Sequence, residues 1–309
     1  MNLIAAAIQM PARLPPGSSR LGAIEAMLAH AASMGARLAV LPEISACGYE
    51  VGRRSFRVAE TVPGPLTETF LEMARRFEMA IVSGLIEREG NRRFNTAFIV
   101  DPTGFKGSYR KVHVSTIENA AWSRGKEPAI IATDLGRVAL GTCADMVYAD
   151  SWKGYRDSEI DLVAIGAAWP DFRGRFFPPT GRRFRSLHFR CVREIPEKIS
   201  RALGVPVIFS NYTGTLCPAF PYLGIPFSVT LAGGSRVVQG VTLADDSFSR
   251  TGVIAAEIEI GTRHPNPDEW GGHWLPGANA WIRGQFHVGE ALCRAAFSPA
   301  YHWRRLRTG

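Results

Sequence analysis

The chain has 309 residues, of which 46% are apolar and 21% charged, and its formal charge at pH 7 is +8. This composition excludes a disordered, collagen-like, coiled-coil or disulfide-scaffold protein and provides apolar material for one large core or two smaller ones. No stretch approaches the roughly 20 apolar residues of a membrane-spanning helix. The N-terminus also lacks the basic region of a secretory signal. We therefore expect a cytoplasmic protein without a membrane partner.

Part of the positive charge is concentrated in one arginine-rich segment. Its members are Arg173, Arg175, Arg182, Arg183, Arg185, Arg190 and Arg193. Such a run suits a nucleic-acid surface, but no zinc-finger, basic-zipper or RNA-recognition motif accompanies it. We expect no nucleic-acid partner, and two interpretations stay open: contact with an anionic substrate, or ordinary solvated surface charge.

The five cysteines are widely spaced and odd in number, at positions 47, 143, 191, 217 and 293. This pattern is typical of reduced thiols rather than of a disulfide framework. The sequence contains no CxxC or HExxH pair, so it predicts neither a metal site nor a cofactor.

The predicted elements alternate between strands and helices in the first half of the chain. Residues 3–9 form an apolar run of strand length, and apolar spacing predicts a helix over 20–34 that ends at Gly35. Asp101-Pro-Thr-Gly104 is typical of a turn between two strands. The other elements expected up to residue 167 are strands at 37–41, 80–85, 95–100, 130–133, 137–142 and 161–167, and a helix at 66–77.

The second half begins with a long predicted helix, residues 182–203, which Pro196 should interrupt or restart. Strands are then expected at 205–210, 227–231, 237–240 and 252–260. No linker separates two halves, so the order of elements predicts a single mixed α/β domain. The last fifty residues, rich in Trp, Pro, Gly and Arg, form an irregular tail.

Three residues with reactive side chains each follow a predicted strand: Glu43, Lys111 and Cys143. Taken alone, each has an ordinary interpretation, as a loop carboxylate, a solvated lysine and a buried structural cysteine. Together they supply a nucleophile, a base to remove its proton and a cation for a developing oxyanion. A Cys–His pairing with His113, His188 or His264 lacks the local signature of a known thiol protease.

A set of short motifs runs in order over nearly the whole length of the chain. They are Ala6-Ala-Ile-Gln9, Leu41-Pro-Glu43 with Gly48-Tyr49, Asn95-Thr-Ala97, Tyr109-Arg-Lys-Val-His113, Glu118 with Trp122 and Gly125, Gly141-Thr-Cys143 with Asp145, Trp169-Pro170, Asn211 with Gly214, and Gly252-Val-Ile-Ala-Ala-Glu257. In this set the chain resembles the nitrilase superfamily of carbon–nitrogen hydrolases. Each motif is weak alone, but the ordered set, with Glu, Lys and Cys at the family's spacing, is specific.

The resemblance implies a role for each reactive residue. Cys143 would be the nucleophile, and Glu43 the base toward it and the proton donor to the leaving amine. Lys111 would stabilise the tetrahedral intermediate with the backbone N–H of Ala144, and Glu118 would position substrate and the hydrolytic water. The residues expected to contact substrate are Tyr49, Ala144, Trp169, Asn211, Arg173, Arg175, Arg182 and Arg183.

The same resemblance implies an α+β fold, a four-layer αββα sandwich. Residues 1–262 would form the hydrolase domain, and residues 263–309 a tail that packs at a subunit interface of a homodimer or larger homo-oligomer. The four tryptophans of the tail, Trp270, Trp274, Trp281 and Trp303, suit such an interface. The alternative is a tail packed on its own subunit.

The sequence also departs from the family pattern in ways that bear on the substrate. Ala144 stands where most relatives carry an aromatic residue, Tyr148-Ala-Asp150 replaces Phe-Pro-Glu, and Pro226 stands where a serine is common. Cys143-Ala-Asp145 is closer to the amidase and carbamoylase branches, whereas Glu118 with Trp122 is closer to nitrilases. We therefore expect a hydrolase of small amides or N-carbamoyl compounds, with a nitrilase or a catalytically inactive binding relative as alternatives.

Overall fold

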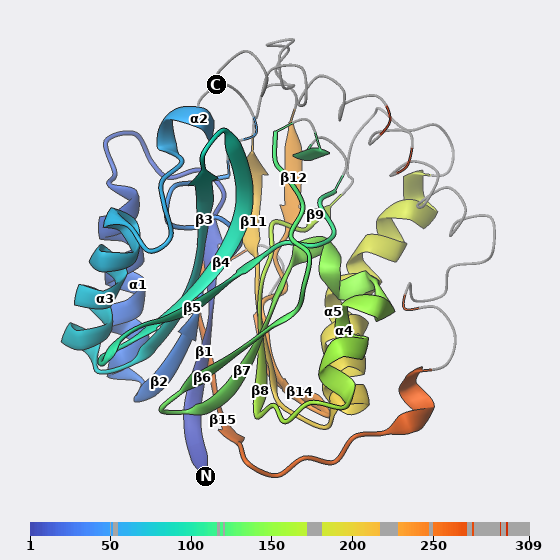
Figure 1. Cartoon of the computed structure of the whole chain (residues 1–309). Coiled ribbons are helices and arrows are strands. Elements are labelled where there is room, and N and C mark those ends of the chain that lie inside the picture. Colours follow the sequence, from blue (N-terminus) through green and yellow to red (C-terminus); the bar gives the residue numbers. More distant parts are fainter. Residues whose placement is uncertain are drawn as a thin grey trace.

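The computed structural model describes most of the chain. The described residues are 1–49, 55–115, 118–119, 121–171, 181–216, 228–246 and 250–270, with the single positions 51, 274, 291 and 295, and the backbone alone at 181–184. Within them the chain forms two β-sheets that lie face to face, with helices on both outer sides (Figure 1).

The first sheet is built around the N-terminal strand. Its described strands are β1 (Asn2–Pro11), β2 (Ala36–Val40), β3 (Ala80–Glu89), β4 (Arg92–Asp101), β5 (Gly104–Arg110), β9 (Pro170–Asp171), β11 (Tyr212–Leu216), β12 (Val229–Ala232) and β15 (Gly252–Glu259). The order is β5-β4-β3-β2-β1-β11-β12-β9, and β15 also pairs with β1. Because β1 is parallel to β2 and antiparallel to β15, it lies inside the sheet, which explains its uninterrupted apolar sequence.

The second sheet has the order β14-β13-β10-β8-β7-β6 in the described part of the chain. Its strands are β6 (Ala129–Thr133), β7 (Gly136–Thr142), β8 (Leu162–Gly166), β10 (Val207–Ser210), β13 (Arg236–Gln239) and β14 (Val241–Asp245). Since β7, β8 and β10 are parallel, their carboxyl ends meet at one edge of the sheet, with Thr142 opposite Gly166.

Helices cover the outer face of each sheet. α1 (Arg20–Ser33) and α3 (Pro65–Phe77) lie against the first sheet, and α4 (Ala149–Arg156) and α5 (Gly181–Leu203) against the second (Figure 1). The short helices are α2 (Ser55–Val58), η2 (Cys143–Val147) and η3 (Pro267–Trp270). No described helix is long and apolar enough to cross a bilayer. The four layers confirm the predicted αββα fold class.

Side chains of β1 alternate between two apolar cores. Ala5 and Ala7 belong to the cluster between the two sheets, whereas Ala6 and Ile8 belong to the cluster beneath α1 and α3. Successive strand residues point to opposite faces of a sheet, so one short strand contributes to both cores. A third cluster packs α5 onto the outer face of the second sheet.

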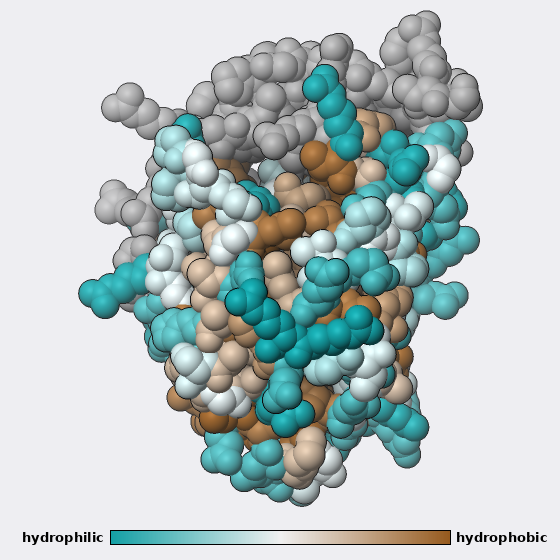
Figure 2. Space-filling model, turned by 90° about the vertical axis from the view of Figure 1, so that its left-hand side faces the viewer, coloured by the Kyte–Doolittle hydropathy of each residue, from teal (hydrophilic) through white to brown (hydrophobic). Residues whose placement is uncertain are grey.

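The outer surface of the first helical layer is largely polar. Figure 2 faces this side and shows hydrophilic side chains spread over it, with apolar atoms visible between them. On α3, Glu68, Glu72 and Arg75 are exposed while Phe70 and Leu71 are buried. The helix is therefore amphipathic, with its apolar side turned to the sheet.

Most elements expected from the sequence are confirmed with ends shifted by a few residues, and β5 lies where a strand was expected between the 101–104 turn and Lys111. The strands β9, β11 and β14 and the helices α2, η2, α4 and η3 were not expected. The interruption predicted at Pro196 is wrong, because α5 continues through it from Gly181 to Leu203. Val192, Ile195 and Ile199 around the proline are buried in the α5 core. Their packing outweighs the roughly 3 kcal/mol that an interior proline costs a helix.

The described start of the C-terminal segment packs on its own chain. Glu269 accepts hydrogen bonds from Arg201 at 2.6 Å and Lys198 at 3.4 Å, both on α5. Trp274 is buried in the α5 core, and Trp270 packs against it. Trp281 and Trp303 lie outside the described residues. The location of residues 263–309 at a subunit interface stays a prediction.

Candidate active site

Glu43 lies on a tight turn that follows β2 and reaches toward the second sheet. Ile44 in this turn has φ 52°, a left-handed conformation that is strained for a β-branched residue. Two glycines make room for the turn. A Cβ at Gly84 of β3 would lie 2.7 Å from the Ile44 nitrogen, and a Cβ at Gly166 of β8 would lie 2.7 Å from the Leu41 carbonyl oxygen. Close backbone contact with both sheets therefore holds Glu43 in place.

Cys143 is the first residue of η2, directly after β7. Its φ is 46°, so the chain leaves the strand in a sharp turn at the cysteine. A sharp turn at a strand end is the geometry that presents a nucleophile beside free backbone N–H groups. Because Thr142 pairs with Gly166, the segment that follows β8 runs beside the cysteine.

Lys111 joins the two carboxylates of the site. It follows β5, and its side chain is fully buried. Its Nζ donates to Glu43 Oε1 at 2.6 Å and to Glu118 Oε2 at 2.8 Å and Oε1 at 3.1 Å. The lysine that sequence reasoning alone would place in solvent is thus the buried cation between two candidate catalytic glutamates.

Glu118 accepts further hydrogen bonds around its carboxylate. Tyr49 OH donates to Oε1 at 2.6 Å, and the backbone nitrogen and hydroxyl of Ser115 donate to Oε2 at 2.9 and 3.1 Å. The Tyr49 ring packs edge-on against Trp122, with 5.7 Å between centroids. These donors fix the orientation of the Glu118 carboxylate.

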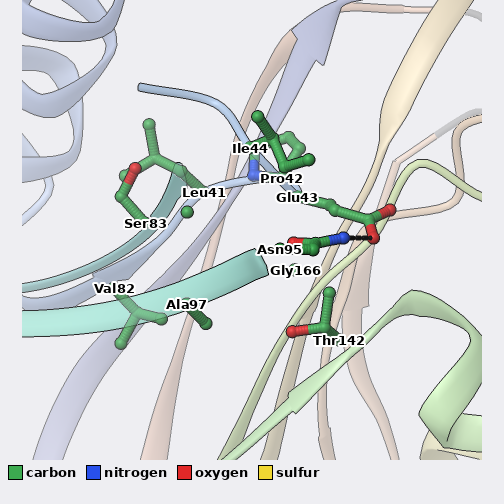
Figure 3. A pocket seen from close by; sticks show the side chains of 11 residues that line it. Leu41, Pro42, Glu43, Ile44, Val82, Ser83, Asn95, Ala97, Thr142 and Gly166 are labelled. Carbon is green, nitrogen blue, oxygen red and sulfur yellow. Dashed lines mark hydrogen bonds between the residues drawn. The ribbon is translucent and has the colours of Figure 1, made fainter. Parts of the chain in front are cut away.

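The Glu43 carboxylate has a donor from each sheet. Asn95 of β4 donates from Nδ2 to Oε1 at 2.6 Å, and the backbone nitrogen of Ala168, which follows β8, donates to Oε2 at 2.9 Å. Figure 3 shows the Asn95 amide aimed at Glu43, with Thr142 and Gly166 of the second sheet close by. Neither Asn95 nor Ala168 was expected in the site.

Burial sets the proton affinities of the three central groups. It raises the pKa of Glu43 against the opposing charge of Lys111. It also raises the pKa of the Cys143 thiol well above its usual value, with Glu43 adding to the rise and Lys111 opposing it. For Lys111 burial disfavours the charge, but Glu118 and Glu43 together raise its pKa well above the usual value. The site therefore holds a cationic lysine, a neutral thiol and a carboxylate more basic than an exposed one.

The residues expected to contact substrate fall into different environments. The Tyr49 hydroxyl donates a hydrogen bond to Glu118. Ala144 and Trp169 are buried near Cys143. For Asn211 contact with substrate stays a prediction, and its side chain already has backbone partners. It is fully buried, its Oδ1 accepts from the Trp169 nitrogen at 2.9 Å, and its Nδ2 donates to the Gly233 oxygen at 2.9 Å. Its amide is thus committed to the backbone that places Trp169.

The side chains of the four arginines proposed as substrate contacts lie outside the described part of the structure. Arg173 and Arg175 lie outside the described residues, and Arg182 and Arg183 lie on the first turn of α5, where only the backbone is described. Two others of the arginine-rich segment form ion pairs. Arg185 donates to Asp171 at 2.9 Å, and Arg190 donates to Glu194 at 2.7 Å.

Cys143 differs from the other described cysteines in its surroundings. Cys47, Cys143 and Cys191 are all free thiols, and Cys217 and Cys293 lie outside the described residues. Burial raises the pKa of Cys47 to about 11 and also raises that of Cys191. The Cys143 thiol alone among these three is influenced by both Lys111 and Glu43. No group of three or more His, Cys, Asp or Glu side chains in the described part is arranged to hold a metal ion.

Comparison with known sequences links this geometry to one family. The carbon–nitrogen hydrolase family model matches residues 4–264. Nitrilase 3 of Arabidopsis thaliana is 32% identical over 270 residues, which cover 77% of this chain and 73% of that protein. A nitrilase of Pyrococcus abyssi is 31% identical over 162 residues, which cover 51% of this chain and 62% of that protein, less than two thirds of its length.

Solved structures share the fold at lower sequence identity. A mutant of the amidase from Nesterenkonia sp. AN1 is similar with a TM-score of 0.66 and 19% identity, covering 91% of this chain and 95% of that one. In that structure the acetamide moiety of fluoroacetamide is covalently added at the active-site cysteine. A carbon–nitrogen hydrolase from Helicobacter pylori G27 has a TM-score of 0.68 and 21% identity, covering 83% and 89% of the two chains.

Proposed function

The chain belongs to the carbon–nitrogen hydrolase family of the nitrilase superfamily, and from that premise we propose that it hydrolyses a small linear amide or N-carbamoyl compound through an acyl-thioester on Cys143. The observation that carries the proposal is the buried cluster in which Lys111 binds Glu43 and Glu118. Cys143 lies at the adjoining strand end, under the electrostatic influence of all three groups. A structural thiol has no need of a buried cation and two carboxylates.

In the acylation half-reaction, Glu43 takes the proton of the Cys143 thiol as sulfur attacks the carbonyl carbon. The carbon–sulfur bond forms while the carbonyl electron pair moves to oxygen. Lys111 and the backbone N–H of Ala144 stabilise that oxyanion. When the intermediate collapses, protonated Glu43 donates its proton to the departing nitrogen, and the carbon–nitrogen bond breaks. A carboxyl of raised pKa suits both proton transfers.

In the deacylation half-reaction, Glu43 removes a proton from water as its oxygen attacks the thioester carbon. The second tetrahedral intermediate releases the Cys143 thiolate, which recovers its proton from Glu43, and the acid product leaves. Glu118, held by Tyr49 and Ser115, orients the substrate and this water. Lys111 stays charged throughout because its two carboxylate partners favour the ammonium form.

The turn that bears the nucleophile favours amides over nitriles. Cys143-Ala-Asp145 is similar to the amidase and carbamoylase branches in having aspartate two residues after the cysteine. A nitrilase is the second candidate, supported by the similarity to Arabidopsis nitrilase 3 and by Trp122, which packs beside the Tyr49–Glu118 pair. In that case the same thiol attacks a nitrile carbon, and two waters convert it to acid and ammonia.

A matched substrate panel tests the proposal. Each acyl group is offered as its primary amide and its nitrile, with N-carbamoyl amino acids alongside, and ammonia release gives kcat/KM. We expect amide or N-carbamoyl turnover to exceed nitrile turnover by at least about tenfold, a difference of about 1.4 kcal/mol in transition-state binding. A preference for nitriles supports the alternative. Absence of turnover, together with no mass increase of the Cys143 peptide after treatment with fluoroacetamide, contradicts a hydrolase of either kind.

We further propose that the protein acts in the cytoplasm as a homodimer or larger homo-oligomer, with residues 263–309 at the interface. The wide spacing of free thiols supports a reducing compartment. Light scattering on the full chain, compared with a chain ending at residue 262, tests the assembly. An unchanged monomer in both samples contradicts it.

A further inference from the structure

Asp145 is a buried carboxylate that the reaction steps leave unused. It lies two residues after Cys143 within η2 and is 1% exposed. In the described part of the chain no lysine or arginine forms an ion pair with it, and burial raises its pKa. A buried carboxylate is costly unless donors satisfy it, so its partners indicate what it is for.

In the described residues Asp145 has three side-chain hydrogen-bond partners, all of them donors, and they come from two different segments. The Thr142 nitrogen donates to Oδ2 at 3.0 Å from the end of β7. Tyr109 OH donates to Oδ2 at 2.9 Å, and the His113 nitrogen donates to Oδ1 at 2.9 Å. Tyr109 OH in turn accepts from the Val112 nitrogen at 3.3 Å. One carboxylate thus joins the nucleophile turn to both sides of the segment that carries Lys111.

We propose that Asp145 is a positioning residue that fixes Lys111 relative to Cys143. Lys111 lies between Tyr109 and His113, so a shift of this segment moves its ammonium group away from the thiol and the oxyanion. The inference rests on the roles given above to Lys111 and Cys143. In this proposal Asp145 does not touch the substrate, but it sets the distance between Lys111 and Cys143, which do.

The chemistry of the donors explains why aspartate is required. Two backbone N–H groups and one phenol all point at this side chain, so only a group that accepts hydrogen bonds at both ends satisfies them. An asparagine of the same size presents an NH₂ group to at least one of these donors. The lost hydrogen bond and the repulsion between two facing donors would move the Cys143 turn away from the Tyr109–His113 segment. Even a small displacement of reacting groups lowers the reaction rate strongly.

Two variants and one control test this assignment. We expect Asp145→Asn to lower kcat by roughly 10- to 100-fold with little change in KM. Tyr109→Phe removes one donor to Asp145, together with the acceptor of the Val112 nitrogen, and should lower kcat by about two- to tenfold. Asp101→Asn is the matched control, because Asp101 is also buried, accepts hydrogen bonds from Thr103 and forms an ion pair with Lys106, in the turn between β4 and β5. It should leave kcat unchanged while lowering the melting temperature.

The rate of Cys143 alkylation by iodoacetamide, followed by peptide mass spectrometry across pH, separates positioning from direct electrostatics. Lys111 lowers the thiol pKa. If Asp145 holds Lys111 in place, Asp145→Asn raises the apparent thiol pKa and slows alkylation. Removal of a negative charge acting directly on the thiol would lower the pKa and speed alkylation, which contradicts the proposal. This readout needs no substrate, so it stands even if the proposed function fails.

A double-mutant cycle completes the test. In a Lys111→Met background, Asp145→Asn should cost less than about twofold in kcat, because the residue it positions is gone. A full additive loss there means that Asp145 acts by another route, and the proposal is wrong. Should Asp145→Asn fail to fold, Tyr109→Phe is carried through the same cycle and the same alkylation assay. Unchanged kcat and an unchanged thiol pKa in Tyr109→Phe then overturn the assignment.

Discussion

The two sheets contribute different chemistry to the site. The first sheet delivers the proposed base Glu43 after β2 and its two hydrogen-bond donors, Asn95 on β4 and Lys111 after β5. The second sheet delivers the proposed nucleophile Cys143 after β7 and the backbone donor of Ala168 after β8. Neither set is complete without the other, because the thiol and its base belong to different sheets.

If the proposed mechanism holds, this division makes the contact between the sheets part of the active site. Glu43 and Ala168 are 125 residues apart in sequence and meet only because the Glu43 turn fits between β3 and β8. Changes in the second-sheet set should prevent bond formation. Changes to the residues of the first sheet should slow proton transfer or weaken the stabilisation of the oxyanion. Changes at the contact between the sheets should have the same effects, although they remove no reacting atom.

The largest effect is expected for Cys143→Ala, which removes the only described thiol influenced by both Lys111 and Glu43. Hydrolysis should fall to background while the circular dichroism spectrum and melting temperature stay close to those of the parent chain. Cys47→Ala and Cys191→Ala are the controls, because neither the half-buried Cys47 nor the buried Cys191 is influenced by Lys111 or Glu43, and both should retain substantial kcat. Activity in Cys143→Ala comparable to the controls would remove the covalent mechanism.

Lys111→Met comes next, since it deletes the cation of the first-sheet set and keeps a side chain of similar length. Loss of an oxyanion donor lowers kcat on the order of 100-fold. The same change leaves Glu43 and Glu118 as two buried carboxylates without their cation, so we also expect a lower melting temperature at neutral pH than at pH 5. The measurement is kcat and KM of Lys111→Met and of the parent chain on the best amide substrate. A raised KM with unchanged kcat means that Lys111 only binds substrate.

Gly166→Ala changes the contact between the Glu43 turn and β8 of the second sheet. The added Cβ would meet the Leu41 oxygen at 2.7 Å and the Glu43 nitrogen at 3.1 Å, so the Glu43 turn must move away from the second sheet. We expect a loss of about 1–3 kcal/mol in unfolding free energy and a fall in kcat of about tenfold or more. Gly22→Ala on α1 is the control, because its Cβ would make only ordinary contacts with Ser19. Equal kcat in both variants would show that the turn tolerates displacement.

The parts of this arrangement that sequence could predict are those determined locally. Apolar runs located β2 and β7, and the residues just after them, Glu43 and Cys143, were expected at strand ends. The pairing of these residues with Lys111 depended on the family resemblance, because periodicity carries no information about which strand ends meet. Pro196 shows the opposite case: a strong local signal for a helix break was overridden by tertiary packing.

Contacts with the backbone of distant segments could not be predicted. Asn211 was expected at the substrate, yet its amide bonds the backbone of Trp169 and Gly233, 42 and 22 residues away. The role of Asp145 depends in the same way on the nitrogens of Thr142 and His113. Almost every residue has the same backbone N–H and carbonyl groups, so the sequence does not indicate which of them bonds a given side chain. These partners can be identified only from the folded structure.

A smaller effect, on pH dependence, is expected for Asn95→Leu. The Asn95 amide stabilises the ionised form of Glu43 and so lowers its pKa against the rise caused by burial. Without this donor the pKa of Glu43 rises further, and the acid limb of the kcat/KM profile should move to higher pH. Ser83→Ala is the control, since Ser83 lies close by but bonds Ser45 rather than Glu43. Identical acid limbs in the parent chain and both variants would show that Glu43 does not control this limb.

The smallest effect concerns substrate charge and the arginine-rich segment. A guanidinium holds a substrate carboxylate through two parallel hydrogen bonds, a geometry that lysine cannot reproduce. If one of Arg173, Arg175, Arg182 and Arg183 binds an anionic substrate, its change to lysine should lower kcat/KM for the acid by several-fold and leave a matched neutral amide unaffected.

Arg190→Lys is the control for this experiment. Arg190 lies on the same helix but donates to Glu194 on an exposed surface, where an ion pair contributes at most about 1 kcal/mol. The measured quantity is the ratio of kcat/KM for the acid to that for the neutral amide, in each variant and in the control. A ratio near one in the parent chain that no variant changes would assign the whole segment to solvated surface charge. We would then expect substrate recognition to depend on buried residues near Cys143, such as Ala144 and Trp169, rather than on charge.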